Sequence, residues 1–223
     1  MSKHLQRAIQ NLMQRLIALS ARVEESVRLA IEAVKENDAA KAATVIDLDD
    51  SIDQAEMDIE EECLKILALH QPVAGDLRTI VAALKINNDL ERIGDLSVDI
   101  AKHAIKIIRG DSIGNPFDFT ELFTRVRGMV KDSLDALIRM DAKIADQVLA
   151  DDDKVDALNS QICREVLDKM KQEPEKAETL IQFMHVSKRL ERIADHATNM
   201  AEDLIYLVTG DIVRHGSGLE TGG

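Results

Sequence analysis

The stretch LERIGD at residues 90–95 recurs as LERIAD at residues 190–195. Upstream, the match continues at a shift of 103 residues, so that residues 49–53 align with residues 152–156. The shift changes because the first copy carries extra residues near Pro72. Two copies of this length indicate a duplication of one unit, since a solenoid needs at least about three shorter repeats.

Apolar residues recur at helical spacing along both copies. In the first copy, one pattern covers residues 5–34 and a third covers residues 73–108. The second pattern lies between them; Asn37 or Asp38 is a typical cap for its start, and Pro72 ends it. The second copy repeats the arrangement over residues 118–139, 142–172 and 175–209. We therefore predict an all-α protein with six helices, arranged as two tandem, pseudo-symmetric three-helix bundles.

The boundary between the bundles is predicted in the stretch Asp111–Pro116, which is rich in glycine and proline compared with the rest of the interior. The first bundle then spans residues 1–111 and the second spans residues 112–215. The last residues, 216–223, are predicted to form a flexible tail.

Composition narrows the class of protein further. The 223 residues are 45% hydrophobic but only 2% aromatic, so the core must be aliphatic. A net charge of −13 disfavours nucleic-acid binding, because phosphates would repel the chain. The start of the chain lacks an apolar signal segment, and no run of 18 apolar residues exists. We expect a cytoplasmic protein without direct membrane insertion, in which Cys63 and Cys163 are reduced packing thiols.

Paired acidic residues occupy equivalent places in both copies. The second helix of each unit carries D-x-x-x-D, and the third carries E-x-x-x-D, a spacing that puts both carboxylates on one helix face. One further position extends each third-helix row by a turn, as an acid in the first copy and an amide in the second. The candidate metal ligands are Asp49, Asp53, Glu91, Asp95 and Asp99 in the first unit, and Asp152, Asp156, Glu191, Asp195 and Asn199 in the second.

Stacked carboxylates of this kind suit hard cations, which take several anionic oxygens. We expect divalent or trivalent ions such as Mg²⁺, Mn²⁺ or iron; Zn²⁺ would prefer added His or Cys ligands. His196 adjoins Asp195, but it faces another side of the helix. A solvated acidic face is the simpler alternative for any single motif, whereas four motifs at equivalent places favour metal. A di-iron oxidase is disfavoured because no glutamate has a histidine three residues later.

Other catalytic motifs do not occur: the sequence has no GxxxxGK[ST], GxGxxG, GxSxG or HExxH. His185 lies in an apolar stretch and is predicted to be a half-buried packing residue. Gly75 and Gly94, inside helical patterns, are expected to allow close approach of neighbouring helices.

The chain resembles the PhoU family of phosphate-signalling regulators. The resemblance rests on the two LERI(G/A)D segments, on RMD at 139–141, on DDKVD at 152–156 and on GDIVRH at 210–215. Pro72 with DLR at 76–78 fits the family's first unit. The match covers residues 3–215, nearly the whole chain.

This resemblance implies two three-helix bundles, a homodimer and a bacterial cytoplasmic location. It implies metal ions or clusters held by the E(D)-x-x-x-D motifs, and a non-enzymatic role. Family members repress the phosphate-starvation response and restrain phosphate uptake, acting between the phosphate ABC transporter (its ATPase subunit) and a sensor histidine kinase. Because Asn199 stands where the first unit has Asp99, we expect two related metal sites rather than two identical ones.

Two other functional classes remain as alternatives. A metal-dependent phosphohydrolase would use the same acidic rows, but it needs a nucleophile or general base beside an open metal position. A purely structural helical protein would leave the rows solvated.

Overall fold

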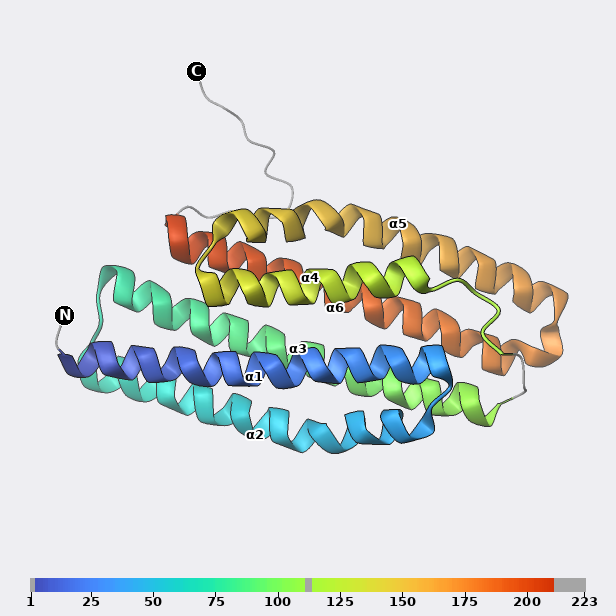
Figure 1. Ribbon diagram of the computed structural model, residues 1–223, viewed down its shortest axis with the longest axis horizontal. Helices are drawn as coiled ribbons and strands as arrows, with labels where there is room; N and C mark the ends of the chain where they lie inside the picture. Colours follow the sequence, from blue (N-terminus) through green and yellow to red (C-terminus); the bar gives the residue numbers. More distant parts are fainter. Residues whose placement is uncertain (1–2, 111–113, 211–223) are drawn as a thin grey trace, which may run out of the picture.

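The computed structural model describes residues 3–110 and 114–210, and this part of the chain is helical, without strands (Figure 1). The helices are α1 (Lys3–Glu36), α2 (Ala39–His70), α3 (Ala74–Arg109), α4 (Thr120–Arg139), α5 (Ala142–Gln172) and α6 (Ala177–Thr209), with a 3₁₀ turn η1 (Pro174–Lys176) before α6. All six predicted helices are confirmed. The tail at 216–223, the unit boundary at 111/112 and the end of the second unit at 215 lie outside the described residues.

The helix boundaries follow local chemistry that both units share. Asp38 caps α2 by accepting hydrogen bonds from the backbone N–H groups of Ala40 and Lys41, at 2.9 and 3.1 Å. At the equivalent place Asp141 caps α5 by accepting from Lys143 N–H at 2.9 Å. These caps satisfy N–H groups that have no partner inside the helix. The duplicated sequence therefore reproduces the same turn twice.

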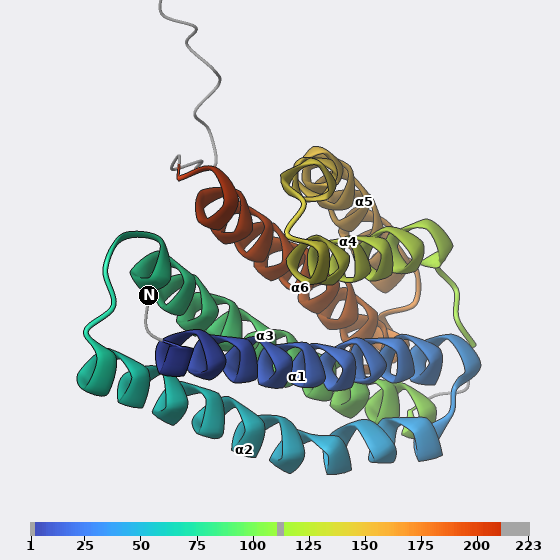
Figure 2. The ribbon, with the colours of Figure 1, turned by 60° about the vertical axis from the view of Figure 1, so that its left-hand side comes forward.

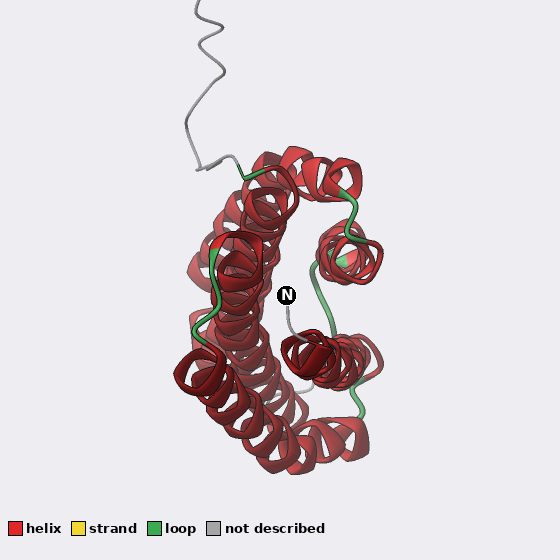
Figure 3. Cartoon of the chain, turned by 90° about the vertical axis from the view of Figure 1, so that its left-hand side faces the viewer, coloured by secondary structure: helices red, strands yellow, loops and turns green. Residues whose placement is uncertain are grey.

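The helices of each unit pack on one another, and the two units meet mainly through α3 and α6. These two helices run antiparallel at the centre of the molecule, with α1 and α4 forming a smaller second contact between the units (Figures 1 and 2). The end-on view shows that the helices of both units share one long direction (Figure 3). The buried apolar residues of both units form one continuous core.

That core is aliphatic, as the composition predicts, except at one place. All four phenylalanines of the chain, Phe117, Phe119, Phe123 and Phe183, are buried near the start of the second unit. Their rings are in contact, with centroids 5.3–6.3 Å apart. The aromatic rings therefore fill the space where the connection between units meets α4 and α6.

Polar contacts hold α3 to α6 along their length. Lys85 Nζ lies 2.6 Å from a carboxylate oxygen of Asp203 at one end of the pair. Asp89, which is only 7% exposed, contacts His196 Nδ1 at 2.8 Å. At the other end, the rings of His103 and His185 stack with centroids 4.8 Å apart. His185 is thus the half-buried packing histidine that the sequence predicts.

The two helical glycines differ in their role. A Cβ at Gly94 would lie 3.2 Å from the Ile52 side chain of α2, which confirms close helix approach there. A Cβ at Gly75 would meet nothing within 4 Å, so that expectation is wrong. Gly75 lies in the first turn of α3, where the helix has not yet packed on a neighbour. No helix in the described ranges is both long and apolar enough to span a bilayer.

We predict that Gly94→Val lowers the free energy of unfolding by about 1–3 kcal/mol, because the added methyl groups overlap the buried Ile52 side chain. Gly128→Ala in α4 is the matched control, since a Cβ there meets nothing within 4 Å. It should stabilise by up to about 1 kcal/mol through helix propensity. Urea unfolding followed by circular dichroism measures both; equal stability of the Val variant and the parent would show that α2 yields freely.

Candidate metal centre

The first acidic row lies along the seam between α2 and α3. Asp49 and Asp53 project from α2, and Glu91 and Asp95 project from α3. Burial raises the pKa of Asp49, and the negative charges of Asp53 and Asp95 raise it further. Burial likewise raises the pKa of Glu91, with added repulsion from Asp95 and Asp53. The four predicted residues therefore form one electrostatic cluster that spans two helices.

One oxygen of this cluster fits a bound cation. Oδ1 of Asp49 is buried and has no hydrogen-bond partner among the described residues. Such an oxygen costs free energy unless a donor or a cation reaches it. Arg92 offsets part of the row's charge, lying 3.3 Å from Asp95 and 3.4 Å from Glu91. An all-oxygen donor set is the kind that hard cations take.

The second row lies along the seam between α5 and α6. Burial raises the pKa of Glu191, and the charges of Asp195 and Asp156 raise it further. Asp152 differs from its counterpart, because the hydroxyl of Thr198 donates a hydrogen bond to its Oδ1 at 3.2 Å. The structure thus brings the second set of predicted ligands to an equivalent seam, with one carboxylate already satisfied by protein.

The two residues that extend the rows have other neighbours. Asp99 accepts a hydrogen bond from Arg189 Nε of α6 at 2.9 Å, so its carboxylate also serves the contact between units. Asn199 lines a hollow with Lys85, Asp89 and Asp203, away from the α5–α6 seam. The metal assignments of Asp99 and Asn199 stay predictions.

In residues 3–110 and 114–210, no three His, Cys, Asp or Glu side chains already enclose a point where a metal ion would sit. The carboxylates are instead spaced along each seam, because like charges repel one another. Binding a cation would require two or three of these side chains to turn toward it. The charge of the cation offsets the repulsion that this rearrangement creates.

Sequence reasoning missed two residues that continue the first row. Burial, with the charges of Glu60 and Asp53, raises the pKa of Glu56, whose Oε1 accepts from Asn87 Nδ2 at 3.0 Å. Their equivalents are Asn159 and Ser187, which bond each other at 2.8 Å without a carboxylate. The signal was present, because Asn87 lies four residues before Glu91 on the same helix face.

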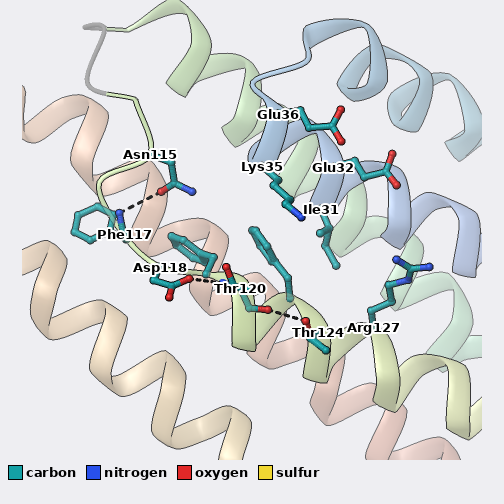
Figure 4. A pocket seen from close by; sticks show the side chains of 12 residues that line it. Ile31, Glu32, Lys35, Glu36, Asn115, Phe117, Asp118, Thr120, Thr124 and Arg127 are labelled. Carbon is teal, nitrogen blue, oxygen red and sulfur yellow. Dashed lines mark hydrogen bonds between the residues drawn. The ribbon is translucent and has the colours of Figure 1, made fainter.

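A separate hollow of about 240 Å³ lies between α1 and the start of α4 (Figure 4). The buried side chains of Ile31 and Phe123 line it, together with Lys35 and Arg127. Both cations belong to exposed side chains. None of the predicted metal ligands lines this hollow, so it is distinct from both rows.

Comparison with known proteins agrees with this arrangement. The PhoU domain family matches the chain twice, over residues 16–104 and 119–204. The chain belongs to the PhoU family. The phosphate-specific transport system accessory protein PhoU homolog of Pseudomonas putida is 37% identical over 215 residues, covering 96% of this chain and 84% of the relative. The Clostridium acetobutylicum homolog is 38% identical, covering 91% and 93%.

Solved PhoU structures share the fold. PhoU from Pseudomonas aeruginosa superposes with a TM-score of 0.88 at 36% identity, covering 92% of this chain and 99% of that one. The phosphate transport system regulatory protein PhoU from Streptococcus pneumoniae gives 0.85 at 26% identity, covering 94% and 99%. Each PhoU domain match contains one complete acidic row.

We predict that Asp49→Asn stabilises the chelator-treated protein at neutral pH by about 0.2–0.5 kcal/mol, since one like charge leaves the row. The pKa of Asp49 is raised in the fold, so its ionisation opposes folding. Below the ordinary pKa of 3.8, Asp49 is protonated in both the folded and the unfolded protein, so its raised pKa does not affect stability. As the pH rises from there through the raised pKa, the folded protein loses stability. The difference between variant and parent should therefore shrink as pH falls.

Urea unfolding at pH 7 and pH 4 in EDTA checks this. Asp47→Asn, an exposed position on the same helix, is the control and should change little. A destabilised Asp49→Asn protein at pH 7 would show that the carboxylate has a structural partner.

Proposed function

We propose that this chain is a non-catalytic, cytoplasmic regulator of phosphate homeostasis that restrains phosphate uptake and represses the phosphate-starvation response. One observation supports this proposal above the others: the PhoU domain family matches both three-helix units of the chain. The relatives also align with most of the chain. Those relatives are named as accessory proteins of the phosphate-specific transport system. A regulator of that system is the role that fits both units together.

The proposed partners are proteins. The chain acts as a homodimer and as an adaptor between the ATPase subunit of the phosphate ABC transporter and a sensor histidine kinase. Family resemblance supports these partners. A chain with a net charge of −13 has poor complementarity to nucleic acid, which fits an adaptor that contacts membrane complexes only through other proteins.

The acidic rows are proposed to bind divalent or trivalent cations, with Mg²⁺, Mn²⁺, iron and Zn²⁺ as the candidates. The partnerless, buried oxygen of Asp49 supports this in the first row. The shared electrostatics of Glu191, Asp195 and Asp156 support it in the second. The cations would hold two helices of a unit together, since each row is divided between neighbouring helices.

A metal-dependent phosphohydrolase is the competing function, because it would use the same carboxylates. The names of the relatives favour an accessory role. Turnover of a general phosphomonoester by manganese-loaded protein, lost in row variants, would favour the enzyme instead.

The regulatory role predicts that a strain lacking this gene expresses phosphate-starvation genes even at high phosphate. The wild-type gene should restore repression. Asp95→Ala combined with Asp195→Ala should fail to restore it if cations are needed for regulation, whereas Asp47→Ala with Asp146→Ala, both exposed and outside the rows, should succeed. A phosphatase reporter measures the response; normal repression in the deletion strain would overturn the proposal.

The metal role predicts that protein purified without chelator or affinity metal carries metal ions, which elemental analysis detects. The Asp95→Ala and Asp195→Ala pair should lower the bound metal while circular dichroism shows unchanged helix content. Absence of metal even after loading with Mn²⁺ or iron would reject this role. Loss of helix content in the variant would instead mean that the carboxylates are structural.

A further inference from the structure

A polar cavity of about 280 Å³ lies where the first acidic row meets the second unit. Asp49 of α2 and Asp95 of α3 line one part of it, and Lys102 of α3 with Arg192 of α6 line another. Figure 2 shows α3 and α6 lying side by side at this crossing. Asp99 and Arg92 of α3 also line it. The cavity therefore joins three predicted cation ligands to cationic side chains from both units.

The charges of this cavity are arranged for two ligands of opposite sign. The carboxylates of Asp49, Asp95 and Asp99 attract a cation, and one oxygen of Asp49 has no hydrogen-bond partner among the described residues. Lys102 and Arg192 are the side chains that recognise oxyanions, an ammonium as a point charge and a guanidinium as a planar fork. The volume accommodates both ligands with some water, since one water molecule takes about 30 Å³ of the liquid.

We propose that this cavity binds an inorganic tetrahedral oxyanion of the phosphate class, held by Lys102 and Arg192 and bridged to a cation on Asp49 and Asp95. The inference rests on the proposed cation binding of the first row. An oxyanion alone would face the carboxylates of Asp49, Asp95 and Asp99 and be repelled. The cation reverses that local charge, so each ligand raises the affinity for the other by the same factor.

The second unit lacks the equivalent arrangement. Glu202 stands at the position of Lys102, which reverses the charge that an anion would meet. Thr198 replaces Val98, and its hydroxyl already bonds Asp152, the counterpart of Asp49. The duplicated rows have therefore diverged, and the first unit alone combines carboxylates with the lysine. One oxyanion per chain is expected.

Such a site would give a phosphate regulator a direct response to its own signal. Arg192 belongs to the second unit and Lys102 to the first, so a bound oxyanion links the two units across the α3–α6 contact. Arg189, one turn before Arg192, already bonds Asp99 at the same crossing. Occupancy would therefore act on the relative arrangement of the units.

Equilibrium dialysis of the full chain with radiolabelled inorganic phosphate tests the proposal, at saturating Mn²⁺ and with EDTA. We expect saturable binding of one phosphate per chain with Mn²⁺ and a loss of binding with EDTA. Lys102→Gln with Arg192→Gln should weaken phosphate binding by about ten-fold or more, because two charge-assisted hydrogen bonds are lost. Binding of Mn²⁺ in the absence of phosphate should stay within about two-fold, because the carboxylates are intact.

Lys106→Gln with Arg164→Gln is the control, since it removes the same two charges at exposed positions outside the cavity. It should leave phosphate binding unchanged. Phosphate binding that persists in EDTA, or that both double variants weaken equally, would overturn the proposal. Mn²⁺ binding without any phosphate binding would reject this inference and leave the proposed function standing. Failure to bind Mn²⁺ would reject the proposed metal role itself.

Discussion

The antiparallel packing of α3 on α6 is the contact on which the rest of the structure depends. Each unit alone is a three-helix bundle, and this contact joins their cores into one. Charged pairs such as Lys85–Asp203 and Asp99–Arg189 lie along it. The third helix of each unit therefore has two functional faces. One face carries an acidic row, and another face packs on the other unit of the chain.

Much of the fold could be predicted from the sequence because its determinants are local. Asp38 caps a helix through its own turn, and the i,i+4 spacing of Glu91 and Asp95 fixes a shared face without reference to other helices. The close approach at Gly94 was also predictable, whereas Gly75 shows that a glycine in a helical pattern has no packing role until a neighbour is present. Local patterns therefore located the acidic rows.

The contacts between units could not be predicted, because periodicity says which face is apolar but not which helix covers it. Nothing near Arg189 in the sequence indicates that it bonds Asp99, 90 residues away. The gathering of phenylalanines such as Phe119 and Phe183 at the connection likewise depends on tertiary packing. The cavity beside the first row belongs to this class, since its walls come from three helices of two units.

Divergence between the copies gives the duplicated rows different electrostatic surroundings. In the first unit the buried oxygen of Asp49 lacks a partner, so like charges at the seam are balanced incompletely by protein. In the second unit Thr198 supplies that hydrogen bond. A cation should therefore change the first seam more than the second, because more unfavourable free energy is removed there. Since that seam borders the α3–α6 contact, the proposed cation binding in the first unit would act on how the units are held together.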